Sequence, residues 1–196
     1  MAWLAPVTLT GTHASLVPLS AELAGPLTEA ARDGELWKLW YTAVPSPESM
    51  APTIAQLLQH RDAGTVLPFA VLDASGVPVG MTRMMNLDPV HKRLEVGGTW
   101  YATRVQRSAL NTECKRMLLT HAFDRLDCIA VEFRTHRLNQ QSRRAIERLG
   151  AQLDGILRAH QRTADGNLRD TAVYSITSAE WPTVRTHLDW QLAKPR

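Results

Sequence analysis

The sequence is poor in several residue types that mark particular classes of protein. It has only two cysteines in 196 residues, Cys114 and Cys128, and two thiols among apolar neighbours supply neither a disulfide framework nor a zinc site. It has no apolar run long enough to span a bilayer. The first residues, MAWLAPVTLTG, lack the basic flank and sustained apolar core of a secretory signal. We therefore expect a cytoplasmic protein with neither a membrane segment nor a metal centre.

Charge of either sign is also moderate. Charged residues make up 21% of the chain and hydrophobic residues 44%, which is ordinary for a soluble globular protein. The net charge of +3 is unevenly distributed, because positions 104–169 hold thirteen Arg and Lys against seven Asp and Glu, and the remainder holds nine against twelve. A local basic excess without a basic tail fits either a polyanionic ligand of limited size or a solvated basic face.

The sequence shows no repeat, low-complexity tract or long linker, so we expect one domain over residues 1–196. The expected strands are 7–10, 14–19, 67–72, 79–85, 93–101, 128–133, 152–162 and 169–177. The expected helices are 21–33, 50–60, 110–126, 142–149 and a last one that begins near Ser178. The turn Ala164-Asp165-Gly166-Asn167 joins the last two strands. This order predicts an α/β (α+β) fold with a central mixed, mostly antiparallel, twisted sheet of about seven strands flanked by helices.

The stretch QRSALNT, residues 106–112, links an expected strand to an expected helix. At such a junction, backbone amides and the helix dipole can meet an anion. The stretch lacks glycine, which would allow positive φ and a close approach of the backbone. Asn111 or Thr112 is equally suited to cap the helix, with Glu113 in its first turn. An anion cradle and an ordinary helix cap therefore both remain open from these residues alone.

Three elements in a fixed order extend this observation: EVGGTWY at 95–101, QRSALNTE at 106–113, and RLNQQS at 137–142 opening a helix that closes at Leu149-Gly150. With them, the sequence resembles the GNAT superfamily of acyl-CoA-dependent N-acetyltransferases, and within it the RimJ/RimL-type branch. The resemblance covers nearly the whole chain. It implies a single GNAT-like domain in which strands 95–101 and 128–133 form a splayed parallel pair. It also implies acetyl-CoA as co-substrate, no membrane partner and, as is frequent in the family, a homodimer.

The resemblance also assigns residues to the coenzyme. The family's pyrophosphate loop, Q/R-x-x-G-x-G/A, maps onto residues 106–111 with Ala109 and Asn111 at its two small positions. The residues implied to hold the pyrophosphate are Gln106, Arg107, Ser108, Ala109, Leu110, Asn111 and Thr112. Arg143 or Arg144 would reach the ribose phosphate, although either also fits an ordinary surface arginine.

The pantetheine arm would lie between the splayed strands, pairing with exposed backbone as an added strand does. Gly97-Gly98 fits a bulge or close approach there. Trp100 and Tyr101 would then lie next to the acyl group, or would simply be large residues at a strand end. Asn139 would bind the amide arm of the coenzyme, with an Asn cap of the helix as the alternative.

The implied reaction is direct attack of a primary amine on the thioester. Ser142 matches the family position whose hydroxyl lies near the departing sulfur, so it is the expected general acid, and helix capping is its alternative role. Glu95 is the expected base, acting through a water. His136 and His160 are further candidates because histidine titrates near neutrality.

The acceptor is unidentified: a small molecule, an antibiotic or a protein N-terminus. Its pocket would include Trp37, Trp40, Tyr41 and the loop Pro45-Ser46-Pro47, and these aromatic residues either cover the amine or pack on the sheet, with packing favoured for Trp37. Two other functions are open. The altered loop fits a non-catalytic acyl-CoA-binding module. A pI of about 9.1 fits a nucleic-acid-binding protein, but no recognisable helix-turn-helix or RNA motif supports that reading.

Overall fold

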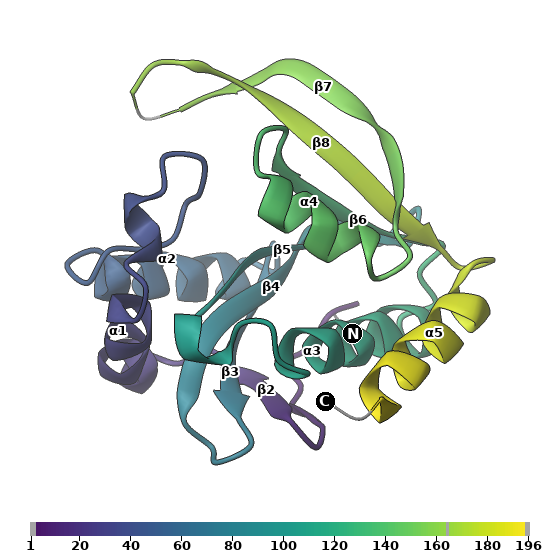
Figure 1. The fold of residues 1–196 in the computed structure, drawn as a ribbon, viewed down its shortest axis with the longest axis horizontal. Coiled ribbons are helices and arrows are strands. Elements are labelled where there is room, and N and C mark those ends of the chain that lie inside the picture. The colour runs from purple at the N-terminus through teal and green to yellow at the C-terminus, as the bar shows by residue number, and fades with distance from the viewer. Residues whose placement is uncertain (1–2, 164, 195–196) are drawn as a thin grey trace.

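The computed structural model describes residues 3–163 and 165–194. Within these ranges eight strands form one mixed sheet in the order β1-β2-β3-β4-β5-β6-β8-β7, one strand more than the approximate number expected (Figure 1). Neighbouring strands are antiparallel except for β5 and β6, which run parallel. The strands are β1 (Leu9–Thr10), β2 (Ala14–Pro18), β3 (Leu67–Asp73), β4 (Pro78–Asp88), β5 (Arg93–Tyr101), β6 (Ala130–His136), β7 (Gln152–Arg162) and β8 (Leu168–Thr177).

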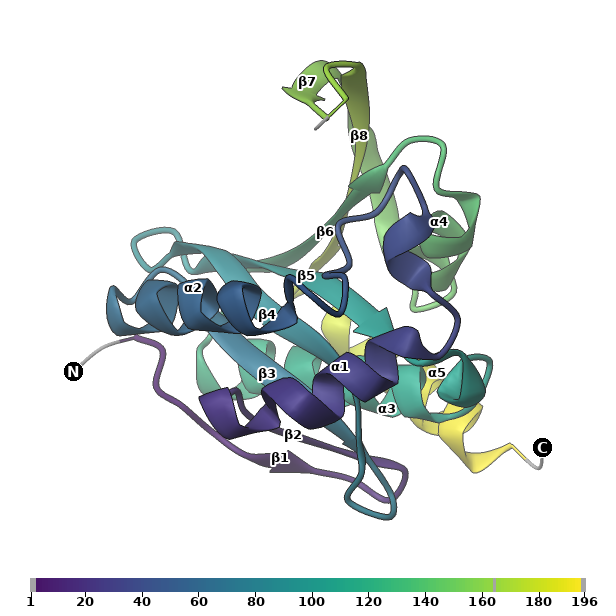
Figure 2. The same cartoon turned by 90° about the vertical axis from the view of Figure 1, so that its left-hand side faces the viewer.

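Helices cover both faces of this sheet. α1 and α2 lie on one face, and α3 and α5 lie on the other (Figure 2). The helices of the described ranges are α1 (Ala24–Arg32), α2 (Met50–Asp62), α3 (Leu110–Thr120), α4 (Gln140–Glu147) and α5 (Trp181–Ala193), with short 3₁₀ segments η1 (Ala21–Leu23), η2 (Leu36–Lys38) and η3 (Thr103–Val105) and a π-helical turn η4 (His121–Arg125). None of the helices in the described ranges has the length and apolar character needed to cross a membrane.

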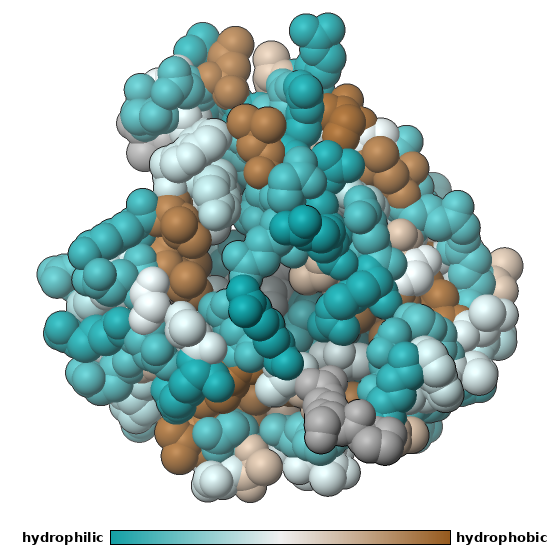
Figure 3. Space-filling view, in the orientation of Figure 1, coloured by the Kyte–Doolittle hydropathy of each residue, from teal (hydrophilic) through white to brown (hydrophobic). Residues whose placement is uncertain are grey.

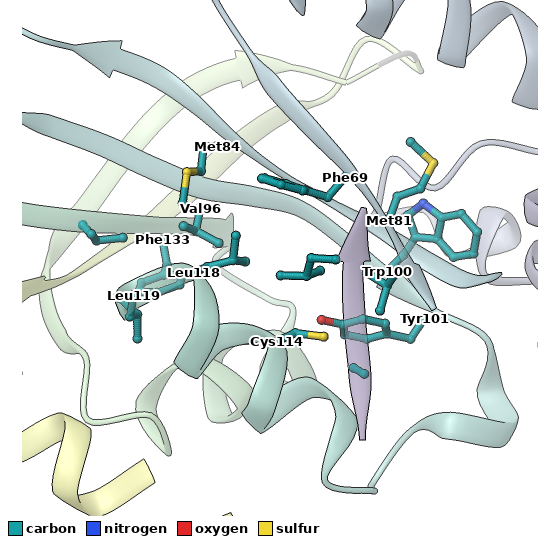
Figure 4. Close-up of a cluster of buried hydrophobic side chains, with 14 of the residues drawn as sticks. Phe69, Met81, Met84, Val96, Trp100, Tyr101, Cys114, Leu118, Leu119 and Phe133 are labelled. Carbon is teal, nitrogen blue, oxygen red and sulfur yellow. The ribbon is translucent and has the colours of Figure 1, made fainter. Parts of the chain in front are cut away.

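The main core lies between the sheet and α3. Leu118 and Leu119 of α3 are fully buried against strand residues such as Met84 and Phe133 (Figure 4). Burial of each such side chain contributes about 1.5–3 kcal/mol. The helical spacing of apolar residues in α3 therefore fixes which side of this helix meets the sheet, and so where its N-terminus lies.

β5 and β6 are bonded over a short stretch only. Their last paired residues are Glu95 and Glu132, after Arg93–Ala130 and Leu94–Val131. Beyond this point β5 stays with β4, whereas β6 continues to His136 alongside β8. The register of β4 and β5 shifts between Met81 and Arg83, and Gly98 has a left-handed φ of 57°. A bulge with a left-handed glycine bends its strand, so the expected splayed parallel pair and the expected bulge are both confirmed.

Several expected boundaries are corrected. β6 begins at Ala130, so Cys128 lies in the preceding loop rather than in the strand. The helix expected to reach Leu126 ends as an α-helix at Thr120 and continues as the π-helical turn η4. The last helix begins at Trp181, three residues beyond the expected start. Ala164, in the expected turn between β7 and β8, lies outside the described residues.

Candidate functional site

The segment between β5 and α3 is shaped by one left-handed residue. Arg107 has a φ of 59°, which costs a non-glycine residue about 1–2 kcal/mol. Ser108 holds the turn on its other side, because its Oγ donates to Val105 O over 2.6 Å and accepts from Leu110 N over 3.3 Å. The positive φ expected of a phosphate loop is thus at Arg107, and Ala109 has an ordinary φ of −66°.

Of the two interpretations left open by the sequence, a helix cap at Asn111 or Thr112 does not occur in the structure. The N-cap of α3 is Ala109, which makes no side-chain cap hydrogen bond. Asn111 and Thr112 already belong to the helix, and their side chains bind elsewhere. Asn111 Oδ1 accepts from Tyr101 Oη over 3.1 Å, and Thr112 Oγ1 accepts from Arg148 Nη1 over 2.8 Å. Of the amides in the first turn, only that of Leu110 bonds a side chain of the described residues, the Ser108 hydroxyl.

Five backbone N–H groups of this segment make no hydrogen bond to any residue in 3–163 or 165–194. They belong to Arg107, Ser108, Ala109, Asn111 and Thr112. Arg107, left-handed after the extended Gln106, turns the chain into α3, and the first N–H groups of a helix have no partner within the helix. The positive end of the α3 dipole adds to their field. This arrangement is suited to a phosphate group.

α4 faces this segment across the gap between the splayed strands. Gln141 Nε2 donates to Gln106 Oε1 over 3.4 Å, which brings the start of α4 to the loop. Asn139 is the N-cap of α4, and its Oδ1 accepts from Ser142 N over 3.0 Å. The capping role of Asn139 is therefore present in the structure, and Ser142 lies partly exposed in the first turn of α4.

The two arginines expected near the ribose phosphate differ in their contacts. Arg143 Nε donates to Tyr174 Oη over 2.7 Å, and its Nη2 lies 3.9 Å from Glu147 Oε1. Arg144 is exposed on the surface of α4. Arg143 is thus held by its own domain, which leaves Arg144 as the better placed of the two for a ligand.

Trp100 and Tyr101 point to opposite faces of β5. Tyr101 points toward Cys114 on α3, whereas Trp100 lies beside Met81 (Figure 4). Both are at most 8% exposed and belong to the hydrophobic core. Burial raises the pKa of Tyr101 well above its ordinary value and that of Cys114 to about 12. The two rings therefore do not face a common ligand, and Cys114 is a protonated, buried thiol.

Val96 lies beside Leu118 of α3 (Figure 4), so the preceding residue of β5, Glu95, points to the opposite face of the sheet. Glu95 is 5% exposed. Its Oε2 accepts from Asn86 Nδ2 over 2.7 Å and lies 3.5 Å from Arg134 Nε. Burial raises the pKa of the Glu95 carboxyl, although the Asn86 hydrogen bond and Arg134 act to lower it. Gly97 provides the space for this carboxylate, since a Cβ on Gly97 would lie 2.8 Å from Glu95 Oε1. A raised pKa makes this carboxylate a stronger base than an ordinary glutamate.

The two histidine candidates have different surroundings. His136 Nδ1 accepts a hydrogen bond from Leu138 N over 3.0 Å, so the neutral ring carries its proton on Nε2. Burial, together with the positive charge of Arg169, lowers the pKa of His136. His160 is exposed on β7, 3.1 Å from Thr171 Oγ1. The basic nitrogen of His136 is thus already occupied, which makes Glu95 the better base.

The aromatic residues expected at the acceptor pocket divide into two kinds. Trp37 packs against the hydrophobic core, as favoured from the sequence. Trp40 is 62% exposed, and its ring lies 5.0 Å from the His136 ring and 5.5 Å from that of Tyr41, edge to face in both cases. Figure 3 shows the surface hollowed between the N-terminal helical segment and α4, with hydrophobic side chains scattered rather than gathered in one patch. Trp40 is therefore available at the surface beside the face that carries Glu95.

Lys115 is a buried residue that no pattern in the sequence singles out. It is 6% exposed, and its Nζ donates to Thr99 Oγ1 over 2.6 Å and to Thr82 Oγ1 over 3.4 Å. Burial lowers its pKa to about 8. Helical periodicity placed the neighbouring Cys114 and Leu118 in the core, but a lysine in such a pattern reads as exposed. Among the described residues, no group of three or more His, Cys, Asp or Glu is placed to hold a metal ion.

Comparison with known proteins relates this geometry to a family. The family described as "Acetyltransferase (GNAT) domain" matches residues 14–152. The "Putative ribosomal N-acetyltransferase YdaF" of Bacillus subtilis is 31% identical over 102 residues, which is 52% of this chain and 55% of that protein. The chain thus matches about half the length of this curated relative.

Solved structures extend the match to nearly the whole chain. A GCN5-related N-acetyltransferase from Brucella melitensis is 28% identical with a TM-score of 0.86, covering 97% of this chain and 87% of that one. RimJ of Mycobacterium smegmatis, in complex with CoA-disulfide, shares the fold with a TM-score of 0.81 at 19% identity, over 95% of each chain. The expected resemblance to the RimJ/RimL-type branch is confirmed. Because the family match spans well over half of its residues, the chain belongs to the GNAT acetyltransferase family.

Proposed function

We propose that the protein is an acetyl-CoA-dependent N-acetyltransferase that transfers the acetyl group directly to a primary amine. The observation that carries this proposal is the set of five unbonded backbone amides from Arg107 to Thr112, at the N-terminus of α3 and beside the splayed strands. Such amides fit a pyrophosphate. Family membership and the CoA-disulfide bound to RimJ support the same coenzyme.

The chemistry requires few groups from the protein. The amine nitrogen attacks the carbonyl carbon of the thioester, a C–N bond forms, and the C–S bond breaks. The coenzyme thiolate takes up a proton as it leaves, and the ammonium formed on the acceptor loses one. One proton donor near the sulfur and one acceptor near the amine therefore suffice.

Ser142 and Glu95 are the groups proposed for these two steps. Ser142 lies in the first turn of α4, where its backbone N–H is held by Asn139 and its hydroxyl is partly exposed. Glu95 lies at the last paired position of β5, where the gap between the strands opens. Its raised pKa supports a role as base, acting through a water because its carboxylate is nearly buried.

A protein or peptide N-terminus is the acceptor class that we favour. An α-amino group has a pKa of about 7.7–8.0, so a useful fraction is neutral at pH 7, whereas a lysine side chain at about 10.4 needs a stronger base. The name of the Bacillus relative points to a ribosomal protein as its acceptor. A homodimer, implied by the family resemblance, and a cytoplasmic location, expected from the sequence, both stay predictions.

Two measurements test the proposal. Calorimetry with acetyl-CoA should give a saturable heat, and acetyl-CoA should raise the melting temperature. Release of free thiol should then depend on an added amine. No heat at concentrations well above micromolar would eliminate both a transferase and a non-catalytic acyl-CoA binder. Binding without amine-dependent thiol release would leave only the binder.

A further inference from the structure

Arg83, on β4, carries a guanidinium that forms no salt bridge with any carboxylate of the described residues. Its Nε contacts Met85 Sδ at 3.3 Å, and its Nη atoms make no hydrogen bond to any described residue. The group lies directly over the bulge, since a Cβ on Gly98 would be 2.6 Å from Arg83 Nε. Burial lowers the pKa of Arg83. The carboxylate that acts on this partly buried cation, Glu95, is already ion-paired with Arg134.

Arg169, on β8, is a second such group. Its Nε is buried and has no hydrogen-bond partner within the described part of the chain. Thr171 pairs with His136 across β8 and β6, and Arg169 precedes Thr171 by two residues. Alternate residues of a strand share a face, so Arg169 lies on the face that carries His136. An unbonded buried donor destabilises the folded protein. We therefore regard Arg169 Nε as a suitable donor to an acceptor atom of a ligand.

Both arginines flank Glu95 on the face opposite to α3. Arg83 pairs in register with Gly97, two residues from Glu95, and the Glu95 carboxylate also acts on Arg169. The other nearby charges are matched, because Glu132 accepts from both Arg93 and Arg134 at 2.8 Å. Glu95 forms its hydrogen bond with Asn86 and its ion pair with Arg134. Arg83 and Arg169 therefore carry the positive charges of this group that no ion pair balances.

We infer that the acceptor is an anionic amine: a primary amine carrying a carboxylate or phosphate near its reacting nitrogen, with that anion bound by Arg83 and Arg169. The inference rests on the proposed acetyl transfer and narrows its substrate class. Guanidinium groups bind both anions through paired, charge-assisted hydrogen bonds. They also repel cationic acceptors, so the same two residues select against lysine-rich termini.

Matched acceptors test this inference. The peptide amides Ser-Asp-Ala and Ser-Asn-Ala have nearly the same shape and differ by one negative charge, and O-phosphoethanolamine and ethanolamine form the phosphate pair. We expect kcat/KM to be at least about 10-fold higher for the anionic member of one pair or of both, the size of one charge-assisted hydrogen bond. Preference within the peptide pair alone identifies a carboxylate, and preference within the other pair alone identifies a phosphate.

Variants connect the preference to the two arginines. Arg83→Gln and Arg169→Gln should each lower kcat/KM for the anionic acceptor by about 10-fold or more and leave the neutral one within about threefold. Arg83→Lys should keep part of the preference because it keeps the charge. Arg32→Gln, at an exposed arginine of α1, is the matched control and should change neither value. Because the two arginines lie on different strands, a local folding defect at the bulge would not explain the same loss in both variants.

The outcomes separate the inference from the function. If acidic and neutral acceptors are acetylated equally well, or if both Gln variants keep the preference, the anionic-acceptor inference is overturned and acetyl transfer stands. If no amine is acetylated while acetyl-CoA binds, the transferase proposal fails. In that case calorimetry with Ser-Asp-Ala amide still measures whether Arg83 and Arg169 bind an anion, and heats equal to those of Ser-Asn-Ala amide would overturn that site too.

Discussion

The carboxylate of Glu113, on α3, lies so close to Gly11 that any side chain on Gly11 would overlap it. The same carboxylate accepts hydrogen bonds from Thr12 N over 2.9 Å and Ala14 N over 2.8 Å, and it also accepts from His13 N. One side chain near the N-terminus of α3 thus closes the turn between β1 and β2, about 100 residues away in the sequence. The glutamate expected only to favour the first turn of a helix instead joins that helix to the edge of the sheet.

Glu113→Gln should lower the free energy of unfolding by about 1–3 kcal/mol, because one of the two accepting oxygens becomes an NH₂ group that faces a backbone donor and leaves it unbonded. Gly11→Ala should destabilise the protein by forcing the same carboxylate away. Urea denaturation measures both effects. Glu29→Gln, at an exposed glutamate of α1, is the control and should stay within about 0.5 kcal/mol of the unmodified protein. Similar stability of Glu113→Gln and this control would show that the contact is dispensable.

Asn111→Pro should weaken acetyl-CoA binding about 10-fold, since it removes one of the five unbonded amides. Proline is tolerated in the first turn of a helix. Asn111→Ala is the matched control, because it loses the same side chain and its bond to Tyr101 but keeps the N–H. The difference in acetyl-CoA affinity between the two variants, measured by calorimetry, gives the contribution of the residue 111 amide. Equal affinities would mean that the amide of residue 111 does not bind the coenzyme.

Ser142→Ala should lower kcat by about 100-fold while the affinity for acetyl-CoA changes little, the pattern of an interaction made in the transition state. Thiol-release kinetics measure kcat, and calorimetry measures the affinity for acetyl-CoA. Ser75→Ala, in the exposed turn between β3 and β4, is the control. Unchanged turnover of Ser142→Ala would remove this hydroxyl from the reaction, and a fall in affinity alone would reduce it to a binding role.

The pH dependence of kcat/KM should show a limb that rises with pH as Glu95 loses its proton. Because burial raises the pKa of Glu95, the midpoint should lie above the ordinary glutamate value of about 4.3. Glu95→Gln should abolish this limb and lower turnover. The stability of the protein should change with pH in the opposite direction. A carboxyl whose pKa is raised in the folded state stabilises that state when it is protonated, so its contribution to the free energy of unfolding is lost as pH rises through that pKa. A limb that persists in Glu95→Gln would assign the base elsewhere.

Lys115 predicts a second dependence on pH. Its pKa falls from the usual value of about 10.4 to about 8 through burial, so between these values the unfolded chain binds more protons than the folded one. Stability from this residue should therefore rise as pH increases from about 8 to 10. Lys115→Met, which keeps the bulk, should lack this gain and be more stable at pH 7 by about 1–3 kcal/mol. Urea denaturation at pH 7 and 9.5 measures the free energy of unfolding of both proteins. If this free energy changes equally between the two pH values in both proteins, the lowered pKa is contradicted.

Much of the scaffold could be predicted because local chemistry decided it. Gly150 ends α4 with a left-handed φ of 98°, and Gly98 forms the bulge, and both are glycines placed where a pattern changes. The turn residues 164–167 separate β7 from β8, and the two strands have nearly the bounds expected on either side of that turn. These signals lie within a few residues of the features they produce.

The rest of the site depends on contacts that no local pattern encodes. Arginine rarely adopts a left-handed conformation, so its presence at position 107 does not indicate a positive φ. The glycine-free loop was therefore expected to be a poorer anion site than the structure indicates. Arg83 and Arg169 lie 86 positions apart on strands that only the folded sheet brings to one face. Whether an arginine has a partner is a property of the assembled structure, and so the two guanidiniums could not be distinguished from surface charges.

The three residue pairs that join β5 to β6 are the only backbone ladder between two blocks of the described sheet, β1 to β5 on one side and β6 to β8 on the other. Such a short seam can act as a hinge, and a coenzyme bonded to both open edges would lock it. Amide exchange should therefore slow on both sides of the seam when acetyl-CoA binds, including at β6 residues far from the pyrophosphate amides. The width of the gap, and with it the alignment of Ser142 and Glu95, would then be set by the ligand as much as by the fold.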